Sequence, residues 1–304
     1  MHSSGLWISD RVAAALAERR PVVALESTII SHGLPRPENL DAAREFEAIL
    51  EDAGVTPATI AMLDGVPHVG LDEIALRRIA NEPMVKASVR DLPILAAKRA
   101  SAATTVASTS YLANLAGIRV FATGGLGGVH RGAADSYDES ADILTLASTP
   151  ITVVSAGVKS VLDIEATLER LETLSIPVIG YGTEVFPRFW LRESDSRLDW
   201  SVDSADEVAR IMRARDDLGL QQGIVLANPV PADQAWTVEE HDRVLDEALA
   251  LADEQGITGK AVTPFLLLEI VKRSGGRSLD VNLDLARNNV RVAGAVAKAW
   301  AALA

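Results

Sequence analysis

Short apolar runs without polar alternation recur along this 304-residue chain, and amphipathic segments separate them. An unbroken apolar run is typical of a strand covered on both faces, whereas a surface helix repeats its apolar residues every three or four positions. We predict strands over Val22–Leu25, Thr59–Leu63, Arg119–Thr123, Ile151–Ser155, Pro177–Gly180 and Gly223–Ala227. We predict helices over Glu38–Glu51, Asp91–Lys98, Ala107–Leu115, Val161–Thr173, Ala205–Ala214, Val238–Asp253 and Leu279–Ala301. This alternation favours an α/β fold, a three-layer α/β/α sandwich with a largely parallel or mixed central sheet.

The bulk properties limit the class of protein. No Pro- or Ser-rich linker, charge block or fixed-period repeat divides the chain, so we expect one domain over residues 1–304. The formal net charge of −13 argues against a nucleic acid or an anionic membrane as the main partner. Without cysteine, disulfides and thiolate chemistry are excluded. The N-terminal residues fit a short amphipathic helix better than a signal peptide, so we expect a cytoplasmic enzyme.

The stretch Ala122–Asp142 is the densest in functional residue types. It contains four glycines in five positions, then a His-Arg pair and several acids: Gly124, Gly125, Gly127, Gly128, His130, Arg131, Asp135, Asp138, Glu139 and Asp142. Glycine lets backbone N–H groups approach an anion, and the spacing is not that of a dinucleotide fingerprint. We therefore predict a site for a small phosphorylated molecule.

The acids of this stretch suggest a divalent cation. Asp138, Ser140 and Asp142 alternate with other residues, which gathers oxygen atoms near a predicted helix start. One carboxylate with several waters can hold Mg²⁺ or Mn²⁺ loosely. The alternative is that these residues cap the helix or face water.

Glu26 and Lys159 both follow predicted strands, where open α/β sheets place their ligands. Partial burial of Glu26 would raise its pKa toward the range of general acid–base catalysis; otherwise it caps backbone or faces water. Burial of Lys159 would favour the neutral amine, which is the nucleophilic form, although most lysines after a strand are surface residues.

Three further residues are candidates for binding the substrate. Lys86 follows an apolar turn and is suited to a phosphate, if it is not simply solvated. Val106 opens a predicted helix, whose first N–H groups can bind an anion. Asn282 begins the last helical region, where its amide either bonds a sugar hydroxyl or secures a turn.

Together these segments resemble the pseudouridine-5′-phosphate glycosidase family, also called the indigoidine synthase A-like family. The matching segments run from about Pro21 to Gly294: ALESTIISHGLP, GVTPATIAML, ATTVAST, FATGGLGGVHRG, SAGVKS, GYGTEVFP, ANPVP, TPFLL and NNVRVAG. The resemblance implies reversible conversion of pseudouridine 5′-phosphate to uracil and ribose 5-phosphate. It also implies an α/β/α fold and a homotrimer.

The resemblance assigns roles to individual residues. It implies Lys159 as the Schiff-base nucleophile and Glu26 as the proton donor and acceptor. It implies substrate-binding positions at Lys86, Val106, Ser140, Ala141 and Asp142, with His130 and Asn282 beside the sugar phosphate. Asp138 matches the position of the family's metal, expected to be one Mn²⁺ per subunit, with Mg²⁺ or another divalent ion as alternatives.

Two positions depart from the family pattern, and two other functions remain open. Val89 stands where an arginine is common, and Val262 replaces a hydroxyl residue between Lys260 and Thr263. A Schiff-base lyase or aldolase-like enzyme for another sugar phosphate would share Lys159. A sugar-phosphate-binding protein without turnover would need neither Lys159 nor Glu26.

Overall fold

The computed structural model describes residues 5–257 and 262–303. Eleven strands of these residues join in one sheet, in the order β1-β4-β3-β2-β7-β8-β11-β9-β10, with β5 joined to β6 and β6 to β3. The strands are β1 (Trp7–Ile8), β2 (Val22–Leu25), β3 (Thr56–Leu63), β4 (Val66–Val69), β5 (Val85–Ala87), β6 (Ala102–Thr104), β7 (Val120–Ala122), β8 (Thr152–Ser155), β9 (Val178–Tyr181), β10 (Ser201–Val202) and β11 (Ile224–Ala227).

The centre of the sheet is parallel, and one side of it is mixed. Strands β3, β2, β7, β8, β11 and β9 are parallel neighbours, whereas β3 pairs antiparallel with both β4 and β6. Every residue of β2, β3, β7, β8 and β11 is buried, as the unbroken apolar runs predicted. The strands β1, β4, β5, β6 and β10 were not predicted, because none of them is an unbroken run of three or more strongly apolar residues.

Helices form the outer layers. They are α1 (Asp10–Ala17), α2 (Glu38–Asp52), α3 (Glu73–Asn81), α4 (Leu92–Lys98), α5 (Val106–Ala116), α6 (Ala133–Ser136), α7 (Ala141–Leu146), α8 (Ile164–Thr173), α9 (Ala205–Asp217), α10 (Val238–Glu254), α11 (Val262–Arg273) and α12 (Arg277–Ala302). Two further single turns are η1 (Ile29–Gly33) and η2 (Val89–Asp91). None of the described helices is long and apolar enough to cross a membrane.

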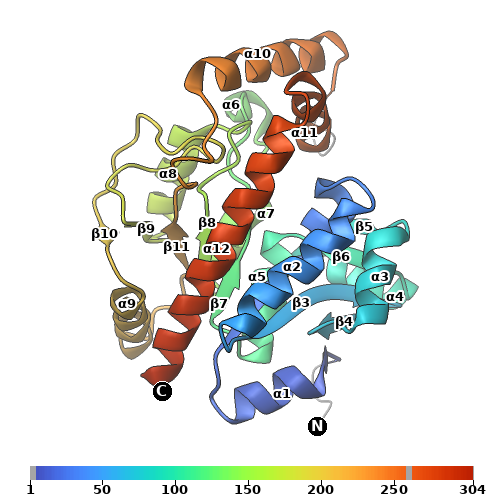
Figure 1. Ribbon diagram of the computed structural model, residues 1–304, viewed down its shortest axis with the longest axis vertical. Coiled ribbons are helices and arrows are strands. Elements are labelled where there is room, and N and C mark those ends of the chain that lie inside the picture. The colour runs from blue at the N-terminus through green and yellow to red at the C-terminus, as the bar shows by residue number, and fades with distance from the viewer. Residues whose placement is uncertain (1–4, 258–261, 304) are drawn as a thin grey trace.

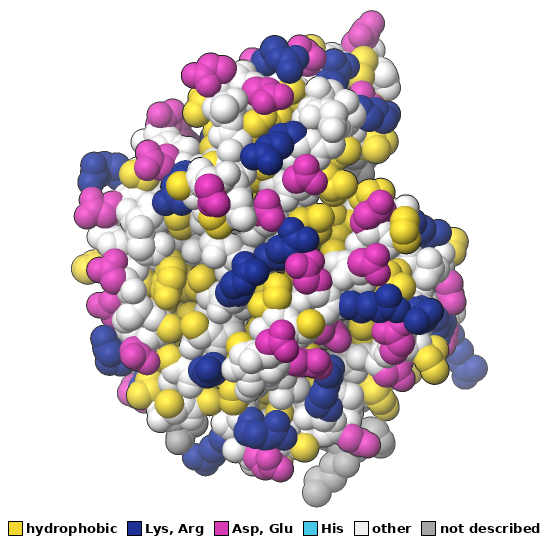
Figure 2. Space-filling model, viewed as in Figure 1, with side chains coloured by type: hydrophobic (Ala, Val, Ile, Leu, Met, Phe, Trp, Pro, Cys, Tyr) yellow, Lys and Arg dark blue, Asp and Glu magenta, His cyan; other side chains and the backbone are white. Residues whose placement is uncertain are grey.

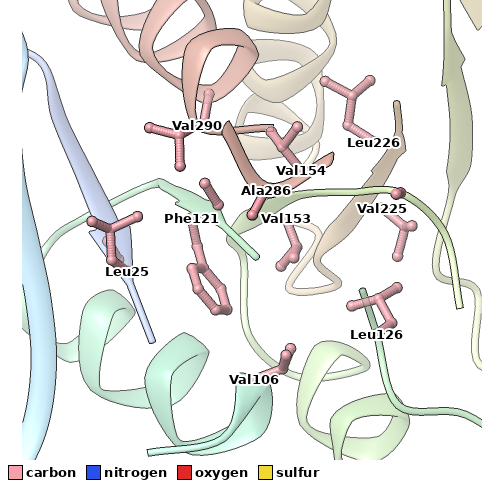
Figure 3. Close-up of a cluster of buried hydrophobic side chains, with 14 of the residues drawn as sticks. Leu25, Val106, Phe121, Leu126, Val153, Val154, Val225, Leu226, Ala286 and Val290 are labelled. Carbon is pink, nitrogen blue, oxygen red and sulfur yellow. The ribbon is translucent and has the colours of Figure 1, made fainter. Parts of the chain in front are cut away.

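The sheet is the middle of three layers. The long helix α12 packs on β2, β7 and β8 and on its neighbours α2 and α9, whereas α5 packs on β2, β3 and α7. Figure 3 shows Ala286 and Val290 of α12 on one side of the central strands and Val106 of α5 on the other, with Phe121 pointing toward α5. The predicted α/β/α sandwich with a mixed sheet is therefore confirmed.

The chain changes direction at the pair β2–β7. From β2 the chain passes through α2 to β3 on one side, and from β7 it passes through α7 to β8 on the other. In Figure 1, α12 runs diagonally across this central part of the sheet. In open α/β sheets, ligands bind outside the carboxyl ends of the strands at such a switch point. The residues that follow β2, β7 and β8 therefore define the candidate site.

Candidate active site

Glu26 and Thr123 lie next to each other at the switch point, where they directly follow β2 and β7. Leu25 is paired with Ala122 at the ends of β2 and β7, so the next residue of each strand is also adjacent. The Thr123 hydroxyl donates a hydrogen bond to Oε1 of Glu26. Burial raises the pKa of Glu26, and the Lys159 ammonium and the Thr123 hydrogen bond offset part of that rise. The sheet therefore holds a half-buried carboxyl group whose pKa lies above that of a free carboxyl group.

Lys159 is held against the Gly-rich loop that follows β7. Val158 forms a parallel bridge with Leu126, and the Lys159 N–H donates to the Leu126 carbonyl at 3.1 Å. The side chain is half-buried, and its Nζ donates to the Gly125 carbonyl at 2.7 Å. The backbone and the ammonium group are thus both fixed on one loop, beside Glu26.

Lys86 reaches the same place from β5. Partial burial lowers the pKa of Lys86, the nearby Lys159 charge lowers it further, and the carboxylates of Glu26 and Asp142 oppose both effects. The residue as a whole is exposed to solvent, so its charge is partly screened. The structure therefore brings together Glu26, Lys86, Asp142 and Lys159, which are far apart in the sequence.

The Gly-rich loop uses its backbone N–H groups inside the protein. Leu126 donates to the Gly157 carbonyl at 2.9 Å, and Gly127 donates to Oδ2 of Asp142 at 2.8 Å. Val129 donates to the Thr167 hydroxyl at 2.9 Å. The loop is consequently an extended segment bonded to its neighbours, and these three groups do not form the phosphate cradle that its glycines suggested.

Close packing explains two of the glycines. A methyl group on Gly127 would overlap the Ser140 hydroxyl and the Asp142 carboxylate, and one on Gly128 would overlap the Thr167 hydroxyl. These contacts exclude any side chain at both positions. The glycines therefore let the loop lie against α7 and α8, which places the Gly125 carbonyl where Lys159 meets it.

Asp142 joins this loop to the start of α5. Its Oδ1 accepts from the Ala107 N–H at 2.9 Å, its Oδ2 accepts from Gly127, and only 6% of the residue is exposed. Ser140 is the N-cap of α7 and accepts from the Asp142 N–H at 3.2 Å, while Ala141 is exposed. Both oxygens of the Asp142 carboxylate thus bond the protein itself, and its predicted contact with substrate stays a prediction.

The first turn of α5 closes the site on the side of Lys86. Val106 is its first residue and is 2% exposed, so only its backbone is suited to a ligand. Thr105 and Ser108 cap the helix reciprocally, with the Thr105 N–H donating to the Ser108 hydroxyl at 2.9 Å. Near this turn, Nε of Arg90 lies 3.9 Å from Oδ1 of Asp91.

Asp138 and His130 lie together beyond the loop. The His130 N–H donates to the Asp138 carbonyl at 3.0 Å, and Nδ1 of His130 lies 3.9 Å from Oδ2 of Asp138. The described residues include no group of three or more potential metal ligands. One carboxylate that is 36% exposed nevertheless suits a cation that keeps most of its water. The residues therefore fit a loosely held Mn²⁺ or Mg²⁺ rather than a closed metal centre.

Helix α12 supports the switch point from the opposite layer. Asn289 is fully buried and donates to the carbonyls of Thr123 and Gly124 at 2.8 and 3.2 Å, and its own Oδ1 accepts from Asn228 at 2.9 Å. Asn282 lies two turns earlier on the same side of the helix and is half-buried.

The roles of Thr123 and Asn289 were not predicted from the sequence. Thr123 is a hydroxyl residue placed directly between a strand and a glycine pair, and Asn289 is an amide within an otherwise apolar helix stripe. Both features can be seen in the sequence. Their hydrogen-bond partners, however, follow only from the pairing of β2 with β7 and from the packing of α12 on the sheet. Lys260, which belongs to the family pattern around Val262, lies outside the described residues.

Comparison with known proteins decides the family. Residues 11–299 match the family described as "Indigoidine synthase A like protein". The chain belongs to this family. The resemblance inferred from the sequence motifs is thereby confirmed.

Relatives in this family share nearly the whole chain. It is 61% identical over 300 residues to a protein of Frankia alni named pseudouridine-5′-phosphate glycosidase, an alignment covering 98% of this chain and 83% of the relative. It is 55% identical over 295 residues to a protein of the same name from Saccharopolyspora erythraea, with 97% of each chain covered.

Solved structures show the same fold. The prealnumycin C-glycosynthase AlnA, in complex with ribulose 5-phosphate, is similar with a TM-score of 0.91 and 38% identity, covering 98% of this chain and 97% of that one. An indigoidine synthase A-like protein of Thermotoga maritima is similar with a TM-score of 0.88 and 37% identity over the same shares.

Proposed function

We propose that this chain is a pseudouridine-5′-phosphate glycosidase, which reversibly converts pseudouridine 5′-phosphate and water into uracil and ribose 5-phosphate. The observation that carries the proposal is the meeting of Glu26 and Lys159 at the switch point of the sheet. It is supported by relatives of that name at 61% and 55% identity.

The substrate explains why a lysine is needed. Ordinary glycosidases protonate a leaving oxygen and use two carboxyl groups, but pseudouridine joins its base to the sugar by a carbon–carbon bond. Attack of the neutral Lys159 amine on C1′ breaks the bond from C1′ to the ring oxygen, and the oxygen takes a proton from Glu26. The attacking nitrogen returns one proton to the Glu26 carboxylate. The C1′–C5 bond then breaks as the nitrogen lone pair forms a protonated imine, and C5 of uracil takes the proton from Glu26. Water hydrolyses the imine and restores the amine.

The environment of each group suits its role. The raised pKa makes Glu26 hold its proton more readily than a free carboxyl group does, which suits the donor that the ring oxygen requires. The Gly125 carbonyl accepts one N–H of Lys159 and so fixes the direction in which the amine faces. Lys86 and the first turn of α5 supply positive charge and backbone N–H groups for the phosphate.

We propose further that Asp138 holds a hydrated Mn²⁺, that the protein is a homotrimer, and that it acts in the cytoplasm. The exposed carboxylate near His130 and the family resemblance support the metal. Such an ion would neutralise negative charge on the substrate, while binding, orientation and proton transfer fall to the residues named above.

Trapping the imine tests the proposal. Borohydride with ribose 5-phosphate should add one reduced sugar phosphate to Lys159, identified by peptide mass mapping, and Lys159→Ala should take up none. Lys98→Ala removes an exposed lysine of α4 and is the matched control, which should label like the wild type. Turnover without label on Lys159 would refute the mechanism.

The similarity to a C-glycosynthase favours one alternative, a Schiff-base enzyme that joins ribose 5-phosphate to another carbon nucleophile. Incubation of the protein with uracil and ribose 5-phosphate should yield a new ultraviolet-absorbing product. If Lys159 is labelled but no uracil product forms, the imine mechanism is supported and the substrate carries a base other than uracil.

A further inference from the structure

A cavity lies at the amino-terminal edge of the sheet, opposite the candidate active site. It has a volume of about 190 Å³ and opens where β2 and β7 begin, at Val22 and Val120. Its polar lining consists mainly of Arg19, Arg20 and Arg119, beside the indole of Trp300. Three guanidinium groups around one cavity are unusual in a chain whose net charge is −13.

Among the residues that the structure describes, the guanidinium groups behind the cavity outnumber the carboxylates that pair with them. Nη2 of Arg119 donates to both oxygens of Asp216, at 2.5 and 2.6 Å, and Arg215 donates to Oδ1 of the same carboxylate at 3.0 and 2.9 Å. One carboxylate therefore serves two guanidinium groups, and the side chain of Arg215 is only 5% exposed. Nε of Arg119 and Nη1 of Arg215 are buried and lack a partner among the described residues.

The remaining cations add to this excess. The guanidinium carbons of Arg119 and Arg213 lie 5.5 and 4.9 Å from the ring centroid of Trp300. Arg20 pairs with Glu18 at 2.7 Å, whereas the described residues offer Arg19 no ion pair. Buried cations and unpaired N–H groups are stable only when a partner compensates them.

We propose that this cavity binds a small oxyanion, inorganic phosphate or a phosphomonoester. Arginine presents a planar fork of donors that matches phosphate oxygens, and the cavity is lined by the exposed Arg19 and Arg20 as well as by Arg119. A cavity of this volume admits a phosphate group with a small substituent. The site is separate from the candidate active site, because it lies at the amino-terminal ends of β2 and β7, whereas Glu26 and the Gly-rich loop follow their carboxyl ends.

Calorimetric titration with inorganic phosphate at constant ionic strength tests the proposal. Arg19 and Arg20 are exposed, so Arg19→Ala/Arg20→Ala removes cavity charge without removing buried contacts. We expect this double variant to weaken phosphate binding at least tenfold. Arg210→Ala/Arg291→Ala removes two exposed arginines elsewhere, and its affinity should stay within twofold of the wild type.

A second set of measurements separates this site from the active site. Phosphate should change tryptophan fluorescence in the wild type and in Lys86→Ala, but not in Trp300→Phe. Sulfate should compete with phosphate, whereas acetate at equal concentration should not if a tetrahedral anion is required. A single phosphate site that is lost in Lys86→Ala, or unchanged affinity in the Arg19/Arg20 variant, would overturn the proposal.

Discussion

Replacement of Asp142 by asparagine tests how the active site is held together. The carboxylate accepts the Ala107 N–H at 2.9 Å and the Gly127 N–H at 2.8 Å, and 6% of the residue is exposed. Asparagine keeps the shape but has one oxygen, and its amide NH₂ cannot accept a hydrogen bond. One of the two backbone N–H groups must therefore face another donor.

The expected loss of stability follows from these two bonds. A hydrogen bond to a charged group contributes about 1.5–3 kcal/mol, and a neutral acceptor contributes about 1 kcal/mol. Losing one charged bond and weakening the other gives about 3 kcal/mol. The negative charge in the first turn of α7 adds about 0.5 kcal/mol through the helix dipole. We expect Asp142→Asn to reduce the free energy of unfolding by about 3–4 kcal/mol.

Urea unfolding followed by circular dichroism measures this change. Asp135→Asn is the matched control, because Asp135 is exposed, and its effect should stay within about 0.5 kcal/mol. The midpoint should fall for Asp142→Asn with little change in the slope. If this variant unfolds like the control but binds substrate poorly, Asp142 contacts the substrate directly and its proposed structural role is wrong.

Three further predictions concern the switch point. Thr123→Val removes a hydrogen bond that lowers the pKa of Glu26. The pH at which activity falls because Glu26 ionises should therefore rise. If that pH does not change, Glu26 is not the proton donor for opening of the sugar ring. Because the folded-state pKa of Glu26 is raised, its ionisation destabilises the fold as the pH rises from the unfolded toward the folded pKa. Glu26→Gln should therefore be more stable than the wild type by about 0.5–2 kcal/mol at pH 8 and by less at pH 4, as thermal unfolding at both pH values would show. Asn289→Ala leaves the Thr123 and Gly124 carbonyls and the Asn228 amide without their partner, and should reduce the free energy of unfolding by about 2–4 kcal/mol. Its neighbour Asn288 makes one bond, to the Pro229 carbonyl, so an equal loss in Asn288→Ala would contradict this reasoning.

Much of the fold could be predicted because burial leaves a clear pattern. The residues of β2, β8 and β11 are buried throughout, and their apolar runs locate these strands to within about one residue. Strand β4 has an exposed Val66, and β5 has an exposed Val85, so neither gives such a run. Their pairing depends on contacts far away in the sequence, which local patterns do not contain.

Individual residues of the candidate site could be predicted from the sequence, but their positions relative to one another could not. Glu26 and Lys159 could be found because each follows a predicted strand. The strand order 3-2-7-8 cannot be read from the sequence, although it alone makes Glu26 and Thr123 neighbours. The four glycines suggested an anion-binding loop. Close packing against neighbouring side chains and close approach to a ligand both require glycine, so the sequence alone does not distinguish these two roles.

The bonding of the Gly-rich loop narrows where a substrate phosphate can lie. The N–H groups of Leu126, Gly127 and Val129 are bonded inside the protein, so they cannot also bind an anion. At the start of α5, the Asp142 carboxylate accepts from the Ala107 N–H. The first N–H of the helix, at Val106, has no partner among the described residues and is suited to a ligand. Lys86 approaches from β5 on that side, since Lys86 pairs with Ala103 just before the helix. The phosphate is therefore expected between Lys86 and α5, which leaves the Gly125 carbonyl, Lys159 and Glu26 to face the anomeric carbon.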